Sequence, residues 1–191
     1  ALHDLMVNTS AGYAVYDFNK VYHAVYNFCV VAMSNFYLDV TKDRLYCTNG
    51  AGRKAAQTTM YKILVALDKI IAPILCFTSQ EIWDFMPKTE GMNQYVVFEE
   101  MPKAGQYAAD DAFKAKWAQL IAVRDEVKKV LEQARADKGE GGAASAVEGL
   151  GVAAAHATGE KCERCWKYSS SIGSHAAHPT LCARCASVVE A

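Results

Sequence analysis

The chain has 191 residues, enough for one ordinary domain and a small second unit. Hydrophobic residues make up 52% of it and charged residues 21%, so a packed core is expected and wholesale disorder is not. The net charge of −1 gives no overall basic field, so any contact with RNA must come from local patches. No apolar run approaches the roughly 20 residues that span a membrane, and the N-terminus has no pattern of a secretory signal. Because it does not begin with Met, the chain is expected to start partway through a larger protein.

The first hundred residues have the periodicity of helices. Apolar side chains recur at about 3.6-residue spacing over residues 18–33, and Asp17 precedes this run as a candidate N-cap. A second run of the same kind covers residues 60–74. Pro73 is expected to end or kink that helix near its last turn, because proline lacks the N–H that an interior turn requires.

Two short segments and a third long helix follow in the sequence. The Thr-Ser-Gln-Glu sequence at residues 78–81 matches a capping box, which predicts that a short helix begins there. Residues 95–98 are apolar and bounded by polar residues, which favours an extended segment. The third helix is expected after Asp110, with an apolar face over residues 113–131 and its cations on a solvated face.

Large aromatic residues and three of the seven cysteines are assigned to the core of the helical part, since they fall in or beside apolar stretches. The aromatic residues expected there are Phe36, Tyr37, Trp83 and Trp117. The cysteines expected there as small buried side chains are Cys29, Cys47 and Cys76.

The composition changes to Gly, Ala and Ser between residues 138 and 160, without periodicity, which is typical of a linker. We therefore expect a mainly α fold in three parts. A helical bundle covers residues 1–137, the linker covers residues 138–160, and a small metal-binding knuckle covers residues 161–191.

The knuckle contains two identical Cys-x-x-Cys hooks, Cys162 with Cys165 and Cys182 with Cys185. Each hook places two sulfur atoms within reach of one ion, and two hooks complete the tetrahedral thiolate shell that zinc prefers in structural sites. A segment of roughly 25–30 residues cannot bury enough surface to fold alone, and metal binding can supply the missing free energy. We therefore predict one structural zinc ion with no open coordination position and no catalytic role.

Weaker interpretations of the knuckle involve other ligands or other cysteine chemistry. His175 and His178 could replace a cysteine as ligands, but they lack the paired spacing of the hooks. Two disulfides, a redox-active Cys-x-x-Cys or an iron–sulfur cluster are the remaining alternatives for the cysteines.

Cations and aromatic side chains surround the hooks. Arg164, Trp166 and Lys167 stand out, with further cations at Lys161 and Arg184. This combination suits RNA, because phosphate groups meet the cations and an unstacked base can stack on a ring. Alternatively, Trp166 packs the knuckle against the bundle, and the spacing alone does not choose between the two.

Three segments of the bundle occur in a recognisable order. They are residues 35–46 (Asn-Phe-Tyr-Leu-Asp-Val-Thr-Lys-Asp-Arg-Leu-Tyr), residues 53–58 (Arg-Lys-Ala-Ala-Gln-Thr) and residues 72–83 (Ala-Pro-Ile-Leu-Cys-Phe-Thr-Ser-Gln-Glu-Ile-Trp). These segments closely resemble the helical anticodon-binding domain of the isoleucyl-tRNA synthetases. Residues 161–166 (Lys-Cys-Glu-Arg-Cys-Trp) resemble the C-terminal zinc domain of the bacterial or organellar members of that family.

The resemblance implies a helical bundle of the class I synthetase anticodon-binding type, followed by a four-cysteine zinc knuckle. It also implies a place in a ligase that activates isoleucine with ATP and transfers it to tRNA. The catalytic and editing domains, where ATP and isoleucine bind, would lie upstream, so this chain alone is expected to be inactive. Its expected task is to bind the anticodon stem-loop of isoleucine tRNA, as a cytoplasmic monomer without membrane contact.

Candidate tRNA-binding residues follow from the same motifs. In the knuckle they are Arg164, Trp166 and Lys167. In the bundle they are the cations Lys42, Arg44, Arg53 and Lys54. The family commonly has two arginines where this chain has Arg53 and Lys54, and lysine lacks the fork geometry of a guanidinium group.

The linker departs from the family pattern, because the family usually has a small α/β unit before the zinc hooks. Here about twenty Gly- and Ala-rich residues take its place. Two other function classes also stay open. A zinc finger of this kind ends the formamidopyrimidine-type DNA glycosylases, although the helical periodicity disfavours such a fragment, and a zinc interaction module without an RNA role is the third possibility.

Overall fold

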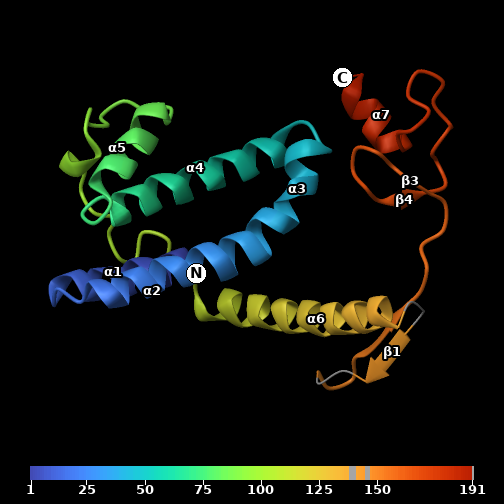
Figure 1. Cartoon of the computed structure of the whole chain (residues 1–191), viewed down its shortest axis with the longest axis horizontal. Helices are drawn as coiled ribbons and strands as arrows, with labels where there is room; N and C mark the ends of the chain where they lie inside the picture. The colour runs from blue at the N-terminus through green and yellow to red at the C-terminus, as the bar shows by residue number, and fades with distance from the viewer. Residues whose placement is uncertain (138–140, 145–146, 191) are drawn as a thin grey trace. The chain divides into compact units, whose positions relative to one another are not determined.

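The computed structural model describes residues 1–137, 141–144 and 147–190 and contains two compact units (Figure 1). One unit, named the helical unit below, comprises residues 1–108 together with residues 187–190. The other comprises residues 109–186. As expected, the fold is mainly α and ends in a four-cysteine cluster.

The helical unit consists of helices, as the periodicity predicts. In chain order these are α1 (Leu2–Ala14), α2 (Phe18–Asn27), the π-helix η1 (Phe28–Tyr37), α3 (Leu38–Tyr46), α4 (Ala51–Ile71), α5 (Cys76–Phe85) and the 3₁₀ helix η2 (Val96–Phe98). The side chain of Asp17 accepts the N–H of Lys20 at 2.9 Å, which confirms Asp17 as the N-cap of α2. α4 ends at Ile71, shortly before Pro73, also as predicted.

The helix predicted from residue 18 onward changes type partway along. α2 runs directly into η1, whose N–H groups bond to carbonyl groups five residues back, and η1 runs directly into α3. The prediction of a single α-helical repeat is therefore wrong over η1.

α1 and α2 approach each other closely at Gly12. A Cβ atom at this position would lie 2.8 Å from Cγ2 of Val21 and 3.1 Å from the carbonyl oxygen of Asp17. A larger residue would therefore push the two helices apart.

Two clusters of apolar side chains form the core of the helical unit. The first joins α1, η1 and α4, and its buried members are Leu5, Met6, Phe28 and Ile70. The second surrounds the fully buried Trp83 of α5, and its other buried members are Ala72, Met86 and Val96. The indole N–H of Trp83 donates to the carbonyl oxygen of Asn93 at 3.0 Å, so burial of this ring leaves no polar atom unpaired.

Two short elements differ from the prediction. α5 begins at Cys76, so Thr78, the residue that would be the N-cap of the predicted capping box, lies inside the helix and does not cap it. Residues 96–98 form the 3₁₀ helix η2 and not an extended segment. The reason is that the N–H of Val96 donates to Oε1 of Gln80 at 3.1 Å and has no strand to pair with in this unit.

The predicted burial holds for some residues and fails for others. Trp83 and Cys47 are buried, as expected, while Phe36, Tyr37 and Cys29 are half-buried. Trp117 is 41% exposed and Cys76 is exposed, so these two predictions are wrong. Both side chains belong to exposed helical surfaces, since their neighbours Phe113 and Phe77 are exposed as well.

The second unit begins with α6 (Asp111–Ala136), the long helix expected after Asp110. The Asp110 side chain accepts the N–H of Phe113 at 2.7 Å and caps this helix. β1 (Gly141–Ala144) pairs with β2 (Gly151–Ala154) in antiparallel register, and both strands contact α6. The structure thus has two strands in the stretch assigned to the linker, while residues 138–140 and 145–146 of that stretch lie outside the described residues. The proposed domain boundaries stay a prediction.

The knuckle consists of a short hairpin and a helix. β3 (Glu160–Lys161) pairs with β4 (Tyr168–Ser169) in antiparallel register, and α7 (Ala183–Val189) follows the second cysteine hook. Among the helices that the structure describes, none has the length and apolar composition needed to cross a membrane.

Candidate metal centre and nucleic-acid surface

The two cysteine hooks meet in space. The four sulfur atoms of Cys162, Cys165, Cys182 and Cys185 all lie within 4.8 Å of one another. Three of these residues are buried and Cys165 is half-buried, so the cluster is largely closed to water. This spacing and closure fit one tetrahedral zinc ion held by four thiolates.

Backbone hydrogen bonds shape the first hook. The N–H of Cys162 donates to the carbonyl oxygen of Lys167 at 2.9 Å, and the N–H of Trp166 donates to the carbonyl oxygen of Cys162 at 2.9 Å. Trp166 takes a positive φ of 61°, which turns the chain back toward β4 directly after Cys165. The hook is therefore a tight hairpin turn that presents both sulfur atoms to one side.

The environment of Cys162 favours its thiolate form. Burial raises the pKa of this thiol, but backbone N–H groups of Cys165, Cys182 and Arg164 that point at the sulfur outweigh burial and bring the pKa to about 6. The N–H of Cys182 lies 3.3 Å from Sγ of Cys162. Burial and hydrogen bonds with the side chains of the neighbouring cysteines raise the pKa of Cys185. Four thiolates placed together repel one another, and a divalent cation would offset this repulsion. Zinc binds the thiolate form of cysteine, so its binding favours loss of the thiol protons.

Serine side chains, which the sequence did not single out, tie the loop between the hooks to the second hook. Oγ of Ser171 accepts the N–H of Ala183, the first residue of α7, at 3.1 Å. Ser169 and Ser171 share a hydrogen bond between their hydroxyl groups at 2.8 Å. Three consecutive serines in a loop are a common polar sequence, and only the fold shows that one of them caps α7.

The two histidines of the knuckle do not join the cluster. The rings of His175 and His178 stack on each other with centroids 6.1 Å apart. Neither ring belongs to the group of four ligand atoms, so the described part of the knuckle offers an all-sulfur site.

Trp166 presents its ring to solvent. Its side chain is 70% exposed, while the indole N–H donates to the carbonyl oxygen of Glu163 at 3.0 Å. Nζ of Lys161 lies 4.5 Å from the ring centroid, on the face of the indole. Arg164 and Lys167 are exposed on the same turn. The ring is thus held in place by its N–H, leaving aromatic surface open beside three cations.

The four candidate cations of the helical unit lie on two helices joined by a short turn. Lys42 and Arg44 are exposed on α3, and Arg53 and Lys54 are exposed in the first turn of α4. Lys42 pairs with Asp39 at 3.2 Å on the helix surface. That pair is exposed on both sides, so it contributes little to stability and leaves Lys42 accessible.

Comparison with known proteins supplies the family. A family model described as the anticodon-binding domain of tRNA ligase matches residues 1–147, and a second, described as a zinc finger found in FPG and IleRS, matches residues 159–188. The chain belongs to the family of tRNA-ligase anticodon-binding domains. The resemblance noted in the sequence is thereby confirmed, and so is the structural zinc of the finger. The match over the helices also disfavours a glycosylase fragment, which the finger alone would allow.

Curated relatives of this anticodon-binding chain carry the name isoleucine–tRNA ligase. One from Desulfitobacterium hafniense (strain DSM 10664 / DCB-2) is 40% identical over 227 residues, covering 93% of this chain and 24% of the relative. One from Bacillus mycoides (strain KBAB4) is 36% identical over 236 residues, covering 99% of this chain and 25% of the relative. The chain thus spans about a quarter of the length of these relatives. Both alignments are longer than 191 residues, so the relatives contain residues without a counterpart here.

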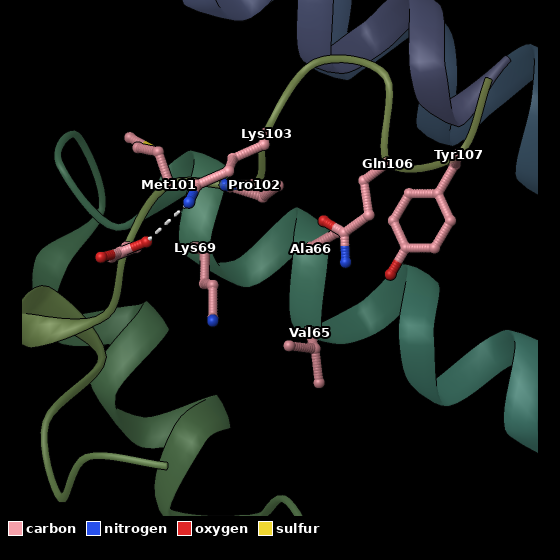
Figure 2. Close-up of a pocket in the computed structure, with 9 residues that line it drawn as sticks. Val65, Ala66, Lys69, Met101, Pro102, Lys103, Gln106 and Tyr107 are labelled. Carbon is pink, nitrogen blue, oxygen red and sulfur yellow. Dashed lines mark ion pairs between the residues drawn. The ribbon is translucent and has the colours of Figure 1, made fainter. Parts of the chain in front are cut away.

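The helical unit also contains a hollow of about 320 Å³ between α4 and the segment that follows η2 (Figure 2). Its lysines are already paired: Lys103 lies 3.5 Å from Glu100, and Lys69 lies 2.5 Å from Glu99 beside the hollow. Burial raises the pKa of Glu99, but hydrogen bonds from Lys69 and Asn93 outweigh burial and hold the pKa below its usual value. The charge of Lys69 is therefore balanced by a half-buried partner, whereas Lys103, in an exposed surface pair, stays accessible.

Proposed function

We propose that this chain is the tRNA-binding C-terminal part of an isoleucine–tRNA ligase and that it recognises the anticodon stem-loop of isoleucine tRNA. The observation that carries the proposal is the succession, in one chain, of a tRNA-ligase anticodon-binding domain and a finger of the IleRS type. The relatives that span both parts are named isoleucine–tRNA ligases.

In the knuckle, Trp166 is the proposed stacking platform for an unpaired base. Its ring is exposed and immobilised by the hydrogen bond to Glu163, so stacking costs little side-chain entropy. Arg164 and Lys167 on the same turn are the proposed phosphate contacts. Zinc enters this function indirectly, because Cys162, Cys165, Cys182 and Cys185 would hold it and thereby fix the turn that carries Trp166.

In the helical unit, Arg53 and Lys54 are proposed to bind phosphate at the start of α4. The first turn of a helix is positive, and α4 has neither an acidic residue nor a side-chain cap in that turn. Two cations there repel the helix dipole, and a phosphate group would offset both charges at once. Lys42 and Arg44 on α3 are the proposed second set of phosphate contacts.

The catalytic steps of the whole ligase are proposed to take place outside this chain. We propose that ATP and isoleucine bind to catalytic and editing domains outside this chain, which by itself catalyses no reaction. Its four-thiolate zinc site leaves no coordination position for a water molecule or substrate, which supports a binding role. We further propose that the protein acts as a monomer in the cytoplasm.

Titration of the 191-residue chain with isoleucine tRNA tests the proposal. Affinity should fall with salt and should be higher for the native anticodon than for the same tRNA with a changed anticodon. Trp166→Ala should weaken binding by about tenfold, because stacking of one base contributes roughly 1–3 kcal/mol. Trp117→Ala, which removes another partly exposed tryptophan, is the matched control and should bind like the parent. Equal affinity for both anticodons would refute anticodon recognition by this chain.

A further inference from the structure

The π-helix η1 joins α2 and α3 into one uninterrupted helical run. The residues at its two ends have α-helical backbone angles, with φ −62° and ψ −39° at Asn27 and φ −65° and ψ −36° at Leu38. The N–H of Leu38 bonds to the carbonyl oxygen of Met33, five residues back. Ten consecutive residues in this conformation are unusual, since π-helical segments are mostly single turns and often lie at functional sites.

The sequence of this run explains why a π-helix forms. Its buried and half-buried side chains recur every four residues in two adjacent rows: Val21, Val25, Cys29, Met33, Tyr37, Thr41 and Leu45 form one row, and Ala24, Phe28, Ala32 and Phe36 form the other. In an α-helix, four residues overshoot a full turn by about 40°, so such a stripe would drift around the helix. A π-helix has about 4.4 residues per turn, so four residues fall short of a turn by about 30° and reverse the drift. The π segment in the middle therefore keeps both ends of the stripe facing the core.

The rotation of α3 about its axis depends on the smaller turn per residue of the π-helix that precedes it. Relative to an all-α run, ten π-helical residues rotate everything after them by about half a turn. Thr41 is 5% exposed, and Lys42 and Arg44 beside it are exposed. Without the π-helix, Thr41 would face solvent and Lys42 would move to the opposite flank of α3.

We propose that η1 is the positioning element that sets the rotation of α3 and thereby presents Lys42 and Arg44 to tRNA phosphate groups. This inference rests on the proposed function for the RNA contact, whereas the rotation itself can be measured without RNA. In this proposal Lys42 and Arg44 contact the phosphate groups, and the residues of η1 only position these two side chains.

Deletions in η1 change the rotation of α3 about its axis without changing the residues of α3 itself. Removing Val31 alone, an exposed residue, puts α3 out of phase by about a quarter of a turn, whether η1 stays π-helical or becomes α-helical. Removing Val31 and Ser34, both exposed, leaves eight residues, which as an α-helix complete about 2.2 turns. Ten π-helical residues complete about 2.3 turns, so the double deletion restores the phase of α3.

Thiol labelling in the full chain reports the rotation. Thr41→Cys should be protected from alkylation in the parent background, reactive in the single deletion and protected again in the double deletion, as read peptide by peptide by mass spectrometry. Circular dichroism of the same samples reports whether each variant is folded. A protected thiol in a folded single deletion would overturn the inference, and so would a reactive thiol in a folded double deletion whose shortened segment is α-helical. If the single deletion does not fold, the double deletion alone decides.

Binding of isoleucine tRNA completes the test. The double variant Lys42→Ala with Arg44→Ala should weaken binding about tenfold or more and reduce the slope of log affinity against log salt by up to about 2. The Val31 deletion should reproduce that loss, and the double deletion should bind like the parent. Parent-like binding by the alanine variant would refute the α3 contacts of the proposed function. Parent-like binding by the Val31 deletion, with weak binding by the alanine variant, would refute the role of η1.

Discussion

In the helical unit, the largest fully buried side chains are Trp83, Met6 and Ile70, whereas in the knuckle they are Cys162 and Cys185. Burial of large apolar side chains stabilises the first set at roughly 1.5–3 kcal/mol each. The knuckle has no comparable apolar core among its described residues, and its buried positions are occupied by metal-binding sulfur. One part of the chain is therefore held by packing and the other by coordination.

This difference affects which side chains remain available for binding. Trp166 and Tyr168, the aromatic residues that a small domain would ordinarily bury, are 70% and 55% exposed in the knuckle. Zinc coordination supplies the free energy that an apolar core would otherwise provide, so these two rings can remain exposed to solvent. In the helical unit the groups considered for RNA are cations on the surfaces of α3 and α4, while the tryptophan of that unit, Trp83, is buried in the core.

Cysteine replacement in the cluster should have the largest effect and should separate the two parts. In Cys162→Ser the site loses one thiolate, so we expect loss of the bound zinc and unfolding of the knuckle, since metal coordination supplies on the order of 10–16 kcal/mol in small zinc modules. Native mass spectrometry gives the zinc content, and limited proteolysis within residues 159–188 reports the unfolding. Cys76→Ser, at an exposed cysteine outside the cluster, is the control and should keep one zinc. A metal-free, disulfide-bonded parent chain under reducing conditions would contradict the zinc site.

The converse variant removes the main packing residue of the helical unit. Trp83→Ala empties a fully buried site and should lower the free energy of unfolding of this unit by about 4 kcal/mol, as measured by urea denaturation. The zinc content should not change. Phe77→Ala, at a side chain that is 89% exposed, should change stability by less than about 0.5 kcal/mol. Loss of zinc in Trp83→Ala would show that the two parts do not depend on separate sources of stability.

Alanine substitutions at two glycines of the knuckle test whether zinc binding depends on the close approach of the backbone around β3 and β4. Gly159 and Gly173 both have positive φ, 87° and 80°, so alanine is strained at either position. Only at Gly159 would the Cβ meet the backbone, 2.5 Å from the carbonyl carbon of Ser169. Gly159→Ala should therefore weaken zinc binding by about tenfold more than Gly173→Ala, through roughly 1–3 kcal/mol of overpacking. Competition with a chelator measures this difference, and equal affinities would mean that β3 and β4 can separate without loss of the site.

The features that were predictable from sequence are those with local causes. Asp17 and Asp110 each accept an N–H three residues ahead, and the cysteine hooks depend on a two-residue spacing. The π-helix escaped prediction because a four-residue repeat and a 3.6-residue repeat are nearly the same over two turns and diverge only over the whole run. The 3₁₀ helix η2 escaped because its first N–H bonds to Gln80, sixteen residues earlier in the chain. At the candidate site, the ligands were predictable, but the caps and close approaches that position them were not.

A smaller and pH-dependent effect is expected from Asp68, a buried carboxyl group in the helical unit. Its side chain is 1% exposed, and neither carboxylate oxygen has a hydrogen-bond partner among the described residues. Burial raises its pKa, and the nearby Ser79 hydroxyl and Lys88 charge offset this only in part. Nζ of Lys88 donates to the carbonyl oxygen of Trp83 and lies over the Trp83 ring, so its charge is directed at other groups.

Asp68→Asn should therefore stabilise the helical unit at neutral pH. A carboxyl group whose folded pKa is raised contributes stability that is fully present below its unfolded pKa of about 3.9 and is lost as the pH rises through the folded value. The amide cannot ionise, so the variant should gain on the order of 1 kcal/mol over the parent at pH 7 and little at pH 4. Urea denaturation at the two pH values measures the gain, and Asp84→Asn, at an exposed carboxylate of α5, should show no such change between them. A gain that is equal at both pH values would mean that Asp68 has the same pKa in the folded and the unfolded chain, and it would contradict the raised pKa.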